Sequence, residues 1–305
     1  MTASASASST TASRTIMRCG LLPGESTPVV LRLHEPLQRY LERQLGIQVE
    51  LVVGKSYAAT GEALRRGHLD IAYLGPVSYV LQSRYVELEP FARPAHPGAV
   101  GPTFKAVIIA PRDRDIATIA DLRGKEIALG DLASTSGTWV PRHMLLEAGL
   151  LADKDYRRLH LGTHDAVAAA VAGKRVAAGA LKQGVFNRLL EEGQLDPTAI
   201  AVLAESRPIP EYMWTFRAGL DPWLKEDLRQ SFFRLRAPEA LRPYQAECFI
   251  PAVDADVDRV RHWMEEILQS RLQSRSEGLG ALAGSNDLGA LSPLAATDFS
   301  PTPIH

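Results

Sequence analysis

Short apolar runs alternate with longer amphipathic stretches from about residue 15 to residue 181. Apolar runs bounded by Gly or Pro predict buried strands, and stretches with a helical apolar period predict helices. The predicted strands span residues 15–23, 48–54, 69–75, 103–111, 125–130 and 175–181. The predicted helices span residues 28–46, 56–67, 76–84, 118–124, 134–149 and 163–173. This alternation predicts an α/β fold in layers, with mostly parallel sheets.

Several predicted helices carry residues typical of helix ends. Ser56 stands at an N-cap position, and Gly67 and Gly46 stand where a helix is expected to stop. Pro76 is suited to the first turn of its helix. Pro141 has no N–H to donate, so we expect it near the start of the helix 134–149.

Two distant segments, 56–64 and 163–171, share the same spacing of a hydroxyl residue and small apolar residues. A glycine and then a predicted strand follow each of them. Any two α/β units look alike to this degree, so the similarity has a plain explanation. The alternative interpretation is that two similar lobes each offer a helix N-terminus to a shared cleft.

Three consecutive hydroxyl residues, Ser134, Thr135 and Ser136, precede Gly137 at the opening of a predicted helix. A helix N-terminus has unpaired N–H donors and a partial positive charge, and hydroxyls add donors that can rotate. An N-cap role explains one of these hydroxyls and leaves the other two without an explanation. Glycine has no side chain, so at Gly137 the backbone can approach a ligand closely. The segment has no G-K-[ST] motif, so nucleotide binding loses its main support. The cluster favours binding of a tetrahedral oxyanion.

His164 stands at another predicted helix start, where the helix dipole disfavours a protonated imidazole. A bound oxyanion would reverse that penalty. The alternative is a surface histidine paired with Asp165. Tyr57, Tyr73 and Tyr79 are either core aromatics or groups at a binding site, and Tyr79 follows a polar helix start.

Composition narrows the function further. The chain has 305 residues, 46% hydrophobic content and a formal net charge of -1, so nucleic acid and acidic membranes are not expected partners. Cys19 and Cys248 lack metal-type or CxxC spacing, and we expect two buried thiols and no metal site. No stretch approaches the roughly 18 apolar residues of a membrane span. The N-terminal residues 1–15 lack the apolar region of a secretory signal, so we expect either that a signal was removed or replaced or that the protein is cytoplasmic.

The sequence resembles the phosphonate, phosphite and phosphate-binding proteins of ABC importers, a branch of the type II periplasmic binding proteins. The segments that carry the resemblance are SYAATGEALRRGHLDIAYLGPVSYV, STSGTWVPRHML, GTHDAVAAAVAGKRVAAGAL, SRPIPEYMWTFRAGLDPWLKEDLRQSFFRL and CFIPAVDADVDRVR. They cover most of the chain from about Ile16 to Arg261. STSG, the helix that opens with His164 and PIPEY follow the order seen in the family.

The resemblance implies two α/β lobes joined by two hinge strands, with a ligand cleft between them. The first lobe would take residues 14–103 and 213–268, and the second residues 104–212. Residues 1–13 and 269–305 would be disordered tails, the latter because Gly, Ser and Pro are frequent there without a helical or strand period.

The resemblance also implies the ligand-binding residues. Tyr57 and Tyr79 would come from the first lobe, and Ser134, Thr135, Ser136 and His164 from the second. Glu211 would stand near the hinge. A carboxylate there helps only by accepting a hydrogen bond from a protonated ligand oxygen or a ligand amine; the alternative is a solvent-facing glutamate.

Relatives that bind larger aminophosphonates often carry an acid within or after the strand that corresponds to AAGAL. Here Leu181, Lys182 and Gln183 stand at that place. We therefore expect a small ligand without an amine: phosphite, phosphate or methylphosphonate. Trp214, Tyr73 and Tyr79 are candidates for an apolar wall that ranks these ligands, although core packing also explains Trp214. The resemblance implies a monomer that works in the periplasm with an ABC permease, with no cofactor and no catalytic residue.

Two other functions fit parts of the sequence. The first is a sensor that passes ligand occupancy to a signalling partner. The second is a cytoplasmic enzyme on the same fold, with His164, Asp165 and Glu211 as acid and base groups. The absence of a signal segment favours the enzyme, whereas the absence of a cofactor motif or nucleophile motif counts against it.

Overall fold

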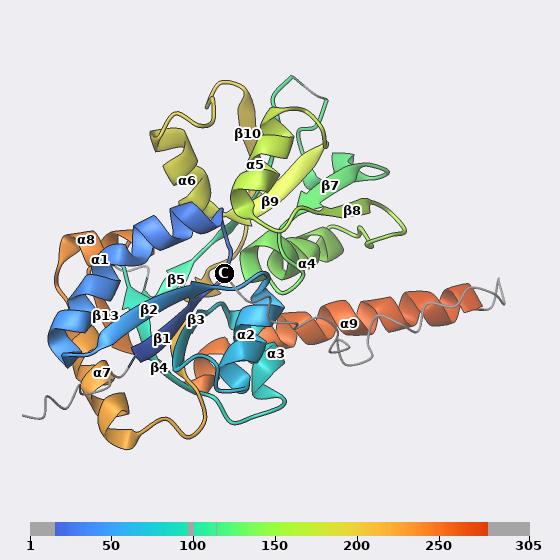
Figure 1. Cartoon of the computed structure of the whole chain (residues 1–305). Helices are drawn as coiled ribbons and strands as arrows, with labels where there is room; N and C mark the ends of the chain where they lie inside the picture. Colours follow the sequence, from blue (N-terminus) through green and yellow to red (C-terminus); the bar gives the residue numbers. More distant parts are fainter. Residues whose placement is uncertain (1–15, 97–100, 114, 280–305) are drawn as a thin grey trace, which may run out of the picture. The chain divides into compact units, whose positions relative to one another are not determined.

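A computed structural model describes residues 16–96, 101–113 and 115–279. The predicted tail 1–13 and residues 280–305 of the other predicted tail lie outside this part of the chain. By their contacts, the described residues up to Ile267 form one compact unit. Strands and helices alternate within it, as the apolar pattern predicts, and they build two separate sheets (Figure 1).

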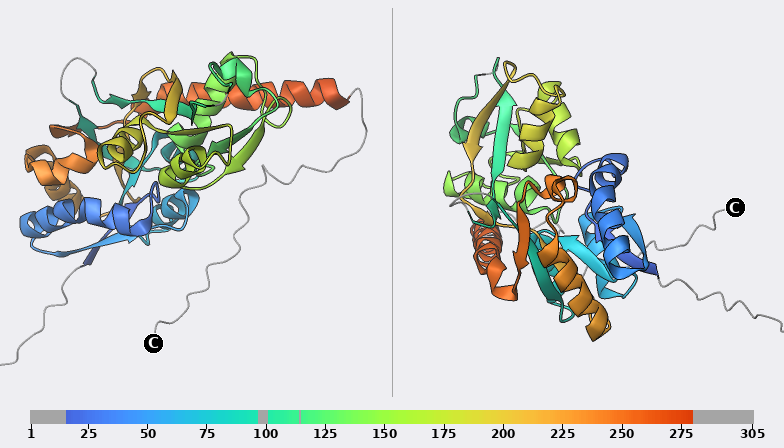
Figure 2. Two further views of the ribbon diagram at one scale, coloured as in Figure 1. Left: turned by 90° about the horizontal axis from the view of Figure 1, so that it is seen from above. Right: turned by 90° about the vertical axis from the view of Figure 1, so that its left-hand side faces the viewer.

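The first sheet has six strands in the order β13-β4-β12-β3-β1-β2. β1 pairs in parallel with β2 and β3, whereas β12 and β13 run antiparallel to their neighbours. We call this sheet and the helices packed on it lobe one. Figure 2 shows its orange elements, from late in the chain, among the blue ones from the start. Its strands are β1 (Ile16–Leu21), β2 (Gln48–Val53), β3 (Ile71–Leu74), β4 (Glu89–Ala95), β12 (Met213–Phe216) and β13 (Cys248–Pro251).

The second sheet has five strands in the order β10-β6-β9-β7-β8. β7 pairs in parallel with β8 and β9, and β6 runs antiparallel to β9 and β10. We call this sheet and its helices lobe two. Its strands are β6 (Ala106–Pro111), β7 (Glu126–Leu129), β8 (Arg157–His160), β9 (Ala178–Lys182) and β10 (Ile200–Glu205).

Helices cover both sheets. α1 packs on β2, α7 on β13 and α5 on β9. The α-helices are α1 (Thr27–Leu45), α2 (Tyr57–Arg65), α3 (Pro76–Ser83), α4 (Val140–Glu147), α5 (His164–Ala172), α6 (Gln183–Glu191), α7 (Pro222–Arg234), α8 (Pro238–Leu241) and α9 (Asp258–Leu279). Single turns of other helix types lie at η2 (Ile119–Leu122), η3 (Thr135–Trp139), η4 (Arg242–Tyr244) and η5 (Asp254–Val257).

Two short strands join the lobes. β5 (Thr103–Phe104) and β11 (Ile209–Pro210) pair antiparallel as a two-stranded sheet of their own. The chain enters lobe two through β5 and returns to lobe one through β11. This pair is the hinge implied by the family resemblance.

The predicted helix ends are confirmed where local chemistry sets them. The Ser56 hydroxyl accepts a hydrogen bond from the Ala59 N–H at 3.1 Å, and Thr163 does the same for Ala166 at 3.3 Å. The two similar segments therefore have matching N-caps. Gly46 ends α1 in the left-handed conformation, with a φ of 68° that glycine adopts without steric cost.

Long-range structure departs from the sequence predictions in two places. The prediction of mostly parallel sheets is wrong. Both sheets are mixed, because β12 runs antiparallel to β3 in the first sheet, and β6 runs antiparallel to β9 and β10 in the second. The single strand predicted at 103–111 is interrupted at Lys105, since β5 pairs in the hinge and β6 in lobe two. An apolar run cannot show that its two parts join different sheets.

The boundaries of two helices differ from the sequence predictions. The predicted helix 134–149 begins as a π-helical turn over Thr135–Trp139, and only then continues as α4. The predicted C-terminal tail begins at residue 269, but α9 continues to Leu279. The polar composition of its last turns gave no apolar helical period to detect.

The core of lobe one is rich in aromatic side chains. Phe91 and Phe216 stack at 3.9 Å between ring centroids, and Trp214 is fully buried beside Tyr73 and Phe232. Trp214 therefore packs in the core. Cys19 is buried, Cys248 is half-buried, and both are free thiols. Within the described residues, no helix has the length and apolar character needed to cross a membrane.

Candidate functional site

The three consecutive hydroxyls lie on the π-helical turn η3, and all three side chains are buried. Ser134 is the N-cap, because its Oγ accepts a hydrogen bond from the Gly137 N–H at 3.0 Å. The Trp139 N–H donates to the Ser134 carbonyl oxygen at 3.1 Å, five residues back. This wide turn holds the hydroxyls at the surface of lobe two that faces lobe one.

Backbone groups of each lobe bond directly to the other lobe. The Val77 N–H donates to Thr135 Oγ1 at 3.0 Å, and the Tyr57 N–H donates to Asp131 Oδ2 at 3.1 Å. In the reverse direction, the His164 N–H donates to the carbonyl oxygen of Gly24 at 2.8 Å. The lobes are therefore in contact, and they use several of the amide donors that the sequence suggested for a ligand.

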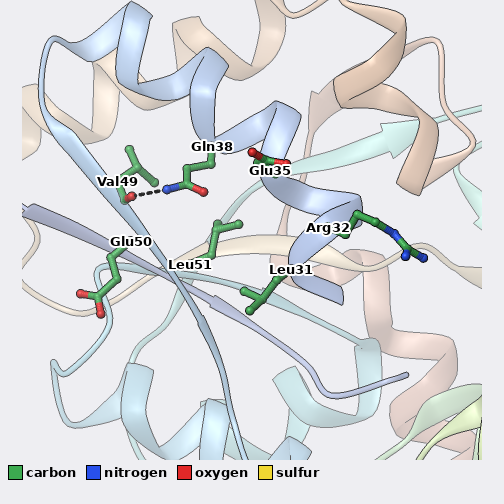
Figure 3. A pocket seen from close by; sticks show the side chains of 7 residues that line it. All are labelled: Leu31, Arg32, Glu35, Gln38, Val49, Glu50 and Leu51. Carbon is green, nitrogen blue, oxygen red and sulfur yellow. Dashed lines mark hydrogen bonds between the residues drawn. The ribbon is translucent and has the colours of Figure 1, made fainter. Parts of the chain in front are cut away.

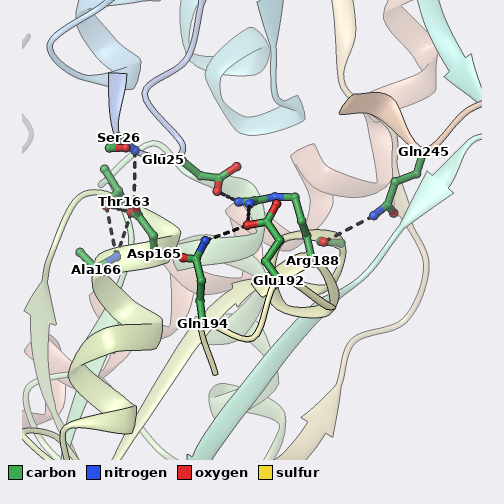
Figure 4. A network of polar contacts seen from close by, with 10 residues as sticks. Glu25, Ser26, Thr163, Asp165, Ala166, Arg188, Glu192, Gln194 and Gln245 are labelled. Carbon is green, nitrogen blue, oxygen red and sulfur yellow. Dashed lines mark hydrogen bonds and ion pairs between the residues drawn. The ribbon is translucent and has the colours of Figure 1, made fainter. Parts of the chain in front are cut away.

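A further polar network joins the loop before α1 to helices α5 and α6 (Figure 4). Glu25 of lobe one forms an ion pair with Arg188 of lobe two, and both side chains are largely buried. Arg188 also contacts Glu192, the C-cap residue of its own helix, at 2.6 Å. The Ser26 N–H donates to Asp165 Oδ2 at 3.2 Å. We call the Glu25–Arg188 pair the interlobe latch.

Three glycines lie where the two lobes meet, and a Cβ on Gly75 would lie 3.3 Å from Thr135 Oγ1 of lobe two. A Cβ on Gly24 would lie 3.0 Å from the Tyr57 hydroxyl, and one on Gly75 would lie 3.0 Å from Tyr212 Cζ. A Cβ on Gly137 would lie 2.9 Å from Ser134 Oγ and 3.0 Å from His164 Cε1. Any side chain at these glycines would meet the groups that line the interface between the lobes.

Ser136 Oγ and His164 Nδ1 are two of the eight buried side-chain polar atoms of the described residues that have no hydrogen-bond partner. Ser136 is fully buried and His164 is 3% exposed. A buried polar group without a partner is costly and uncommon in folded proteins. Both atoms belong to lobe two and lie around Gly137, so two unused hydrogen-bonding groups stand close together there.

His164 is neutral in this arrangement. Burial, followed by the nearby positive charge of Lys182, lowers the pKa of His164 to about 4. A neutral imidazole has one ring nitrogen that donates a hydrogen bond and one that accepts. His164 can therefore donate to an anion or accept a hydrogen bond from a protonated ligand oxygen.

Two tyrosines complete the cluster. Burial, followed by the neighbouring Tyr212 and Asp131, raises the pKa of Tyr57, so its hydroxyl keeps its proton. Burial also raises the pKa of Tyr212, whose hydroxyl lies near Tyr57 and Ser136. Sequence reasoning identified Tyr57 and missed Tyr212. The signal was its place directly after Glu211, in the PIPEY segment at the hinge.

The structure does not bring Tyr79 into this cluster, which corrects the sequence expectation for that residue. The Tyr79 hydroxyl contacts Asp254 Oδ1 at 2.7 Å, within lobe one. The neighbouring Ser78 faces lobe two instead, and its Oγ donates to the carbonyl oxygen of Ala133 at 3.2 Å. One residue along a helix turns the side chain by about 100°, so a motif alone does not say which one faces the cleft.

Glu211 lies in the site, but the protein itself satisfies it. It is 1% exposed, which rules out a solvent-facing glutamate. Lys182 Nζ lies 3.1 Å from Glu211 Oε1, and His96 Nε2 lies 3.1 Å from Oε2. Burial acts to raise the pKa of Glu211, but Lys182 and His96 outweigh it and hold that pKa below its usual value. Glu211 therefore does not require a cationic ligand.

An open groove of about 450 Å³ lies elsewhere on lobe one, between α1 and β2 (Figure 3). Its lining shares no residue with the cluster and includes two carboxylates, Glu35 and Glu50, against one cation, Arg32. Among the described residues, no group of three or more His, Cys, Asp or Glu side chains is placed to hold a metal ion.

Comparison with known proteins gives consistent matches. The family model described as the periplasmic substrate-binding protein of phosphonate ABC transporters matches residues 19–257. The phosphate-import protein PhnD of Mycolicibacterium smegmatis is 26% identical over 268 residues, which are 79% of this chain and 82% of that protein.

Two solved structures share the fold. A binding protein component of an ABC phosphonate transporter from Pseudomonas aeruginosa has a TM-score of 0.79 at 24% identity, covering 85% of this chain and 89% of that one. PhnD1 from Prochlorococcus marinus, in complex with methylphosphonate, has a TM-score of 0.75 at 20% identity, covering 83% and 98%.

Proposed function

Because the chain belongs to the family of periplasmic substrate-binding proteins of phosphonate ABC transporters, we propose that its interlobe cleft binds one small phosphorus oxyanion. The ligand is phosphite, phosphate or methylphosphonate. The binding residues are Tyr57, Ser134, Thr135, Ser136 and His164, together with Ser78 and Tyr212. Thr135 and Ser78 act by joining the lobes around the ligand, since each already bonds across the cleft.

One observation carries this proposal. Ser136 Oγ and His164 Nδ1 are buried between the lobes without a partner, beside a turn rich in hydroxyls. A tetrahedral oxyanion would satisfy both, because its oxygens accept several hydrogen bonds within a small space. The ligands printed for the relatives, phosphate and methylphosphonate, support the same class.

The neutral His164 supports a phosphorus oxyanion over sulfate. Phosphorus oxyanions carry a proton for part of the time near neutral pH, and that P–OH group can donate to an imidazole nitrogen. Sulfate has no proton to donate in this range. A His164 with a pKa of about 4 keeps its acceptor nitrogen available, so the two anions should differ in affinity.

The expected affinity follows from the size of the ligand. Four or five heavy atoms at a ceiling of about 1.5 kcal/mol each give about 6 to 7.5 kcal/mol. This free energy corresponds to a dissociation constant that is roughly micromolar. Charged hydrogen bonds inside the closed cleft would tighten it further.

The family consists of binding proteins of transporters. We therefore propose delivery of the ligand to an ABC permease in the periplasm by a monomer that carries out no catalysis. The residues named for an enzyme do not form an acid and base pair: Asp165 bonds to Thr163 and Ser26, and Glu211 bonds to Lys182 and His96. A sensor gains no support from these contacts.

The direct test is titration calorimetry on protein freed of carried-over ligand by unfolding and refolding. We expect one site for phosphate, phosphite or methylphosphonate, and binding of sulfate at least about ten-fold weaker than the best of these. His164→Ala should weaken binding by about ten-fold or more, since a lost charged hydrogen bond costs about 1.5–3 kcal/mol. No binding of any of the three phosphorus oxyanions would contradict the proposal.

A further inference from the structure

We propose that Lys182 is a specificity-determining residue: its ammonium group occupies a cation-binding subsite in the cleft, and so excludes ligands that carry their own ammonium group. This inference rests on the proposed function. It adds the reason why the ligand is an oxyanion without an amine.

The subsite is built from a carboxylate and two aromatic rings. Lys182 Nζ lies 3.1 Å from Glu211 Oε1 and 4.6 Å from the ring centroids of both Phe104 and Tyr212. An alkylammonium ion binds in this kind of setting, with one charged hydrogen bond and two aromatic faces. We call Glu211, Phe104 and Tyr212 the ammonium cage.

The backbone fixes Lys182 at this position. It is the last residue of β9 and pairs with Ala106 at the start of β6. The next residue, Gln183, donates its N–H to the Lys105 carbonyl oxygen at 3.0 Å. The side chain of Lys182 is 20% exposed and that of Glu211 is 1% exposed, so the ion pair is largely shielded from water. The ammonium group in the cage therefore belongs to Lys182, a residue of the lobe-two sheet, and not to a ligand.

The cage adjoins the oxyanion cluster. Tyr212 belongs to both, because its ring face contacts Lys182 and its hydroxyl lies near Tyr57 and Ser136. The charge of Lys182 is also close enough to act on the His164 imidazole. An ammonium group on a short chain from a bound phosphonate would therefore reach the cage. It would meet the like charge of Lys182 in a region with little water to screen it.

The test compares two ligands on wild type and on Lys182→Ala by titration calorimetry. Methylphosphonate lacks an amine, and 2-aminoethylphosphonate carries one. Wild type should bind methylphosphonate at least about ten-fold more tightly than 2-aminoethylphosphonate. Lys182→Ala empties the cage and should reduce that preference by at least about ten-fold, through gained cation–π and charged contacts. The ratio is compared because loss of a nearby positive charge weakens both ligands.

Lys105→Ala is the matched control. Lys105 lies next to the hinge and pairs with Glu205 at 2.8 Å in a more exposed setting, so its removal changes the charge equally without touching the cage. The Lys105→Ala variant should prefer methylphosphonate over 2-aminoethylphosphonate to the same degree as wild type. A Lys182→Ala preference within three-fold of wild type would overturn the inference, and so would wild-type protein that binds both ligands equally.

Removal of Lys182 alone leaves a buried carboxylate poorly compensated and can prevent folding. The double variant Lys182→Ala, Glu211→Gln avoids this, because it removes both charges. Its probe is propylphosphonate, which has nearly the shape of 2-aminoethylphosphonate and no charge on the chain. The emptied space should lower the preference for methylphosphonate over propylphosphonate by at least about ten-fold relative to wild type. An unchanged preference would contradict occupancy of the subsite by Lys182.

The two proposals fail in different ways. If wild type binds none of phosphate, phosphite and methylphosphonate, the proposed function is wrong. If wild type binds methylphosphonate and removal of Lys182 leaves the ligand preferences unchanged, only the role of Lys182 is wrong.

Discussion

Thr135 Oγ1 accepts a hydrogen bond from the Val77 N–H at 3.0 Å, and so one of three adjacent hydroxyls joins the lobes. Its neighbours have other partners. Ser134 Oγ caps its own turn, whereas Ser136 Oγ has no protein partner. The three hydroxyls thus have three different tasks, and substitutions at each should have different effects.

Ser136→Ala should weaken binding of the best oxyanion by about ten-fold or more, because a desolvated hydrogen bond to a charged group is lost. The free energy of unfolding of the unliganded protein should not fall, because the Ser136 hydroxyl is buried without a partner there. Calorimetry and urea unfolding measure the two quantities. Ser231→Ala is the control: its hydroxyl donates to the Asp227 carbonyl oxygen in α7, so stability should fall while affinity stays constant.

Gly137→Ala should reduce affinity by more than ten-fold, because the new Cβ would lie 3.0 Å from His164 Cε1 and 3.2 Å from Gly130 Cα. Neither neighbour can move without shifting the backbone or the imidazole. Gly184→Ala is the comparison, since its Cβ would meet only the end of the flexible Gln245 side chain. Equal affinities in the two variants would show that the close approach at Gly137 does not matter.

The interlobe latch should set affinity for all ligands alike. Glu25→Gln removes the charge that faces Arg188 across the cleft and should weaken every oxyanion by about ten-fold through faster dissociation. The order of ligand preference should stay the same, because Glu25 is not part of the oxyanion cluster.

Glu192→Gln is the control for the latch, because Glu192 contacts Arg188 within one helix and does not cross the cleft. We expect less than a two-fold change for it. A changed ligand order in Glu25→Gln, measured by stopped-flow or calorimetry, would mean that the latch contributes to recognition itself.

His96 should make stability depend on pH. Its hydrogen bond to Glu211 raises the pKa of His96 above the ordinary value. The stabilisation is complete below the unfolded pKa of about 6.5 and is lost as the pH rises through the higher folded pKa. The free energy of unfolding, measured with urea from about pH 6 to about pH 8.5, should therefore fall more in wild type than in His96→Gln. His262→Gln, at an exposed histidine, should retain the wild-type slope.

Tyr79→Phe should leave ligand affinity unchanged and lower the free energy of unfolding by about 1 kcal/mol, the usual value of one hydrogen bond. The reason is that the Tyr79 hydroxyl contacts Asp254 within lobe one. The larger value of a hydrogen bond to a charged group is not expected, because the Asp254 side chain is 59% exposed and also pairs with Arg261. A loss of affinity in this variant would return Tyr79 to the site.

Local chemistry could be predicted from the sequence, and contacts between distant segments could not. Ser56 and Gly46 act at helix ends as expected, and one of the three hydroxyls, Ser134, is an N-cap, because these effects involve only neighbouring residues. The break at Lys105 depends on which strands pair with each half of one apolar run.

The same reason explains the site. His164 and Ser136 are on helix starts that the sequence marks, and the structure brings them together around Gly137. The pairing of Glu211 with Lys182 joins residues 29 positions apart, so a carboxylate near an anion looked as if it needed a ligand partner. Tyr79 and Ser78 differ only in which side of a short helix they occupy, and that depends on how α3 packs.

In the π-helical turn at Thr135–Trp139, the direction of the hydroxyls depends on the number of residues in the turn as well as on their types. Its bonds run over five residues, where an ordinary helix bonds over four. Deleting one residue between Gly137 and Trp139 would let the segment wind as a regular helix and would rotate the preceding hydroxyls by about 100° relative to α4. Such a chain would keep Ser134, Thr135 and Ser136 unaltered in its sequence, yet aim them away from the proposed anion site.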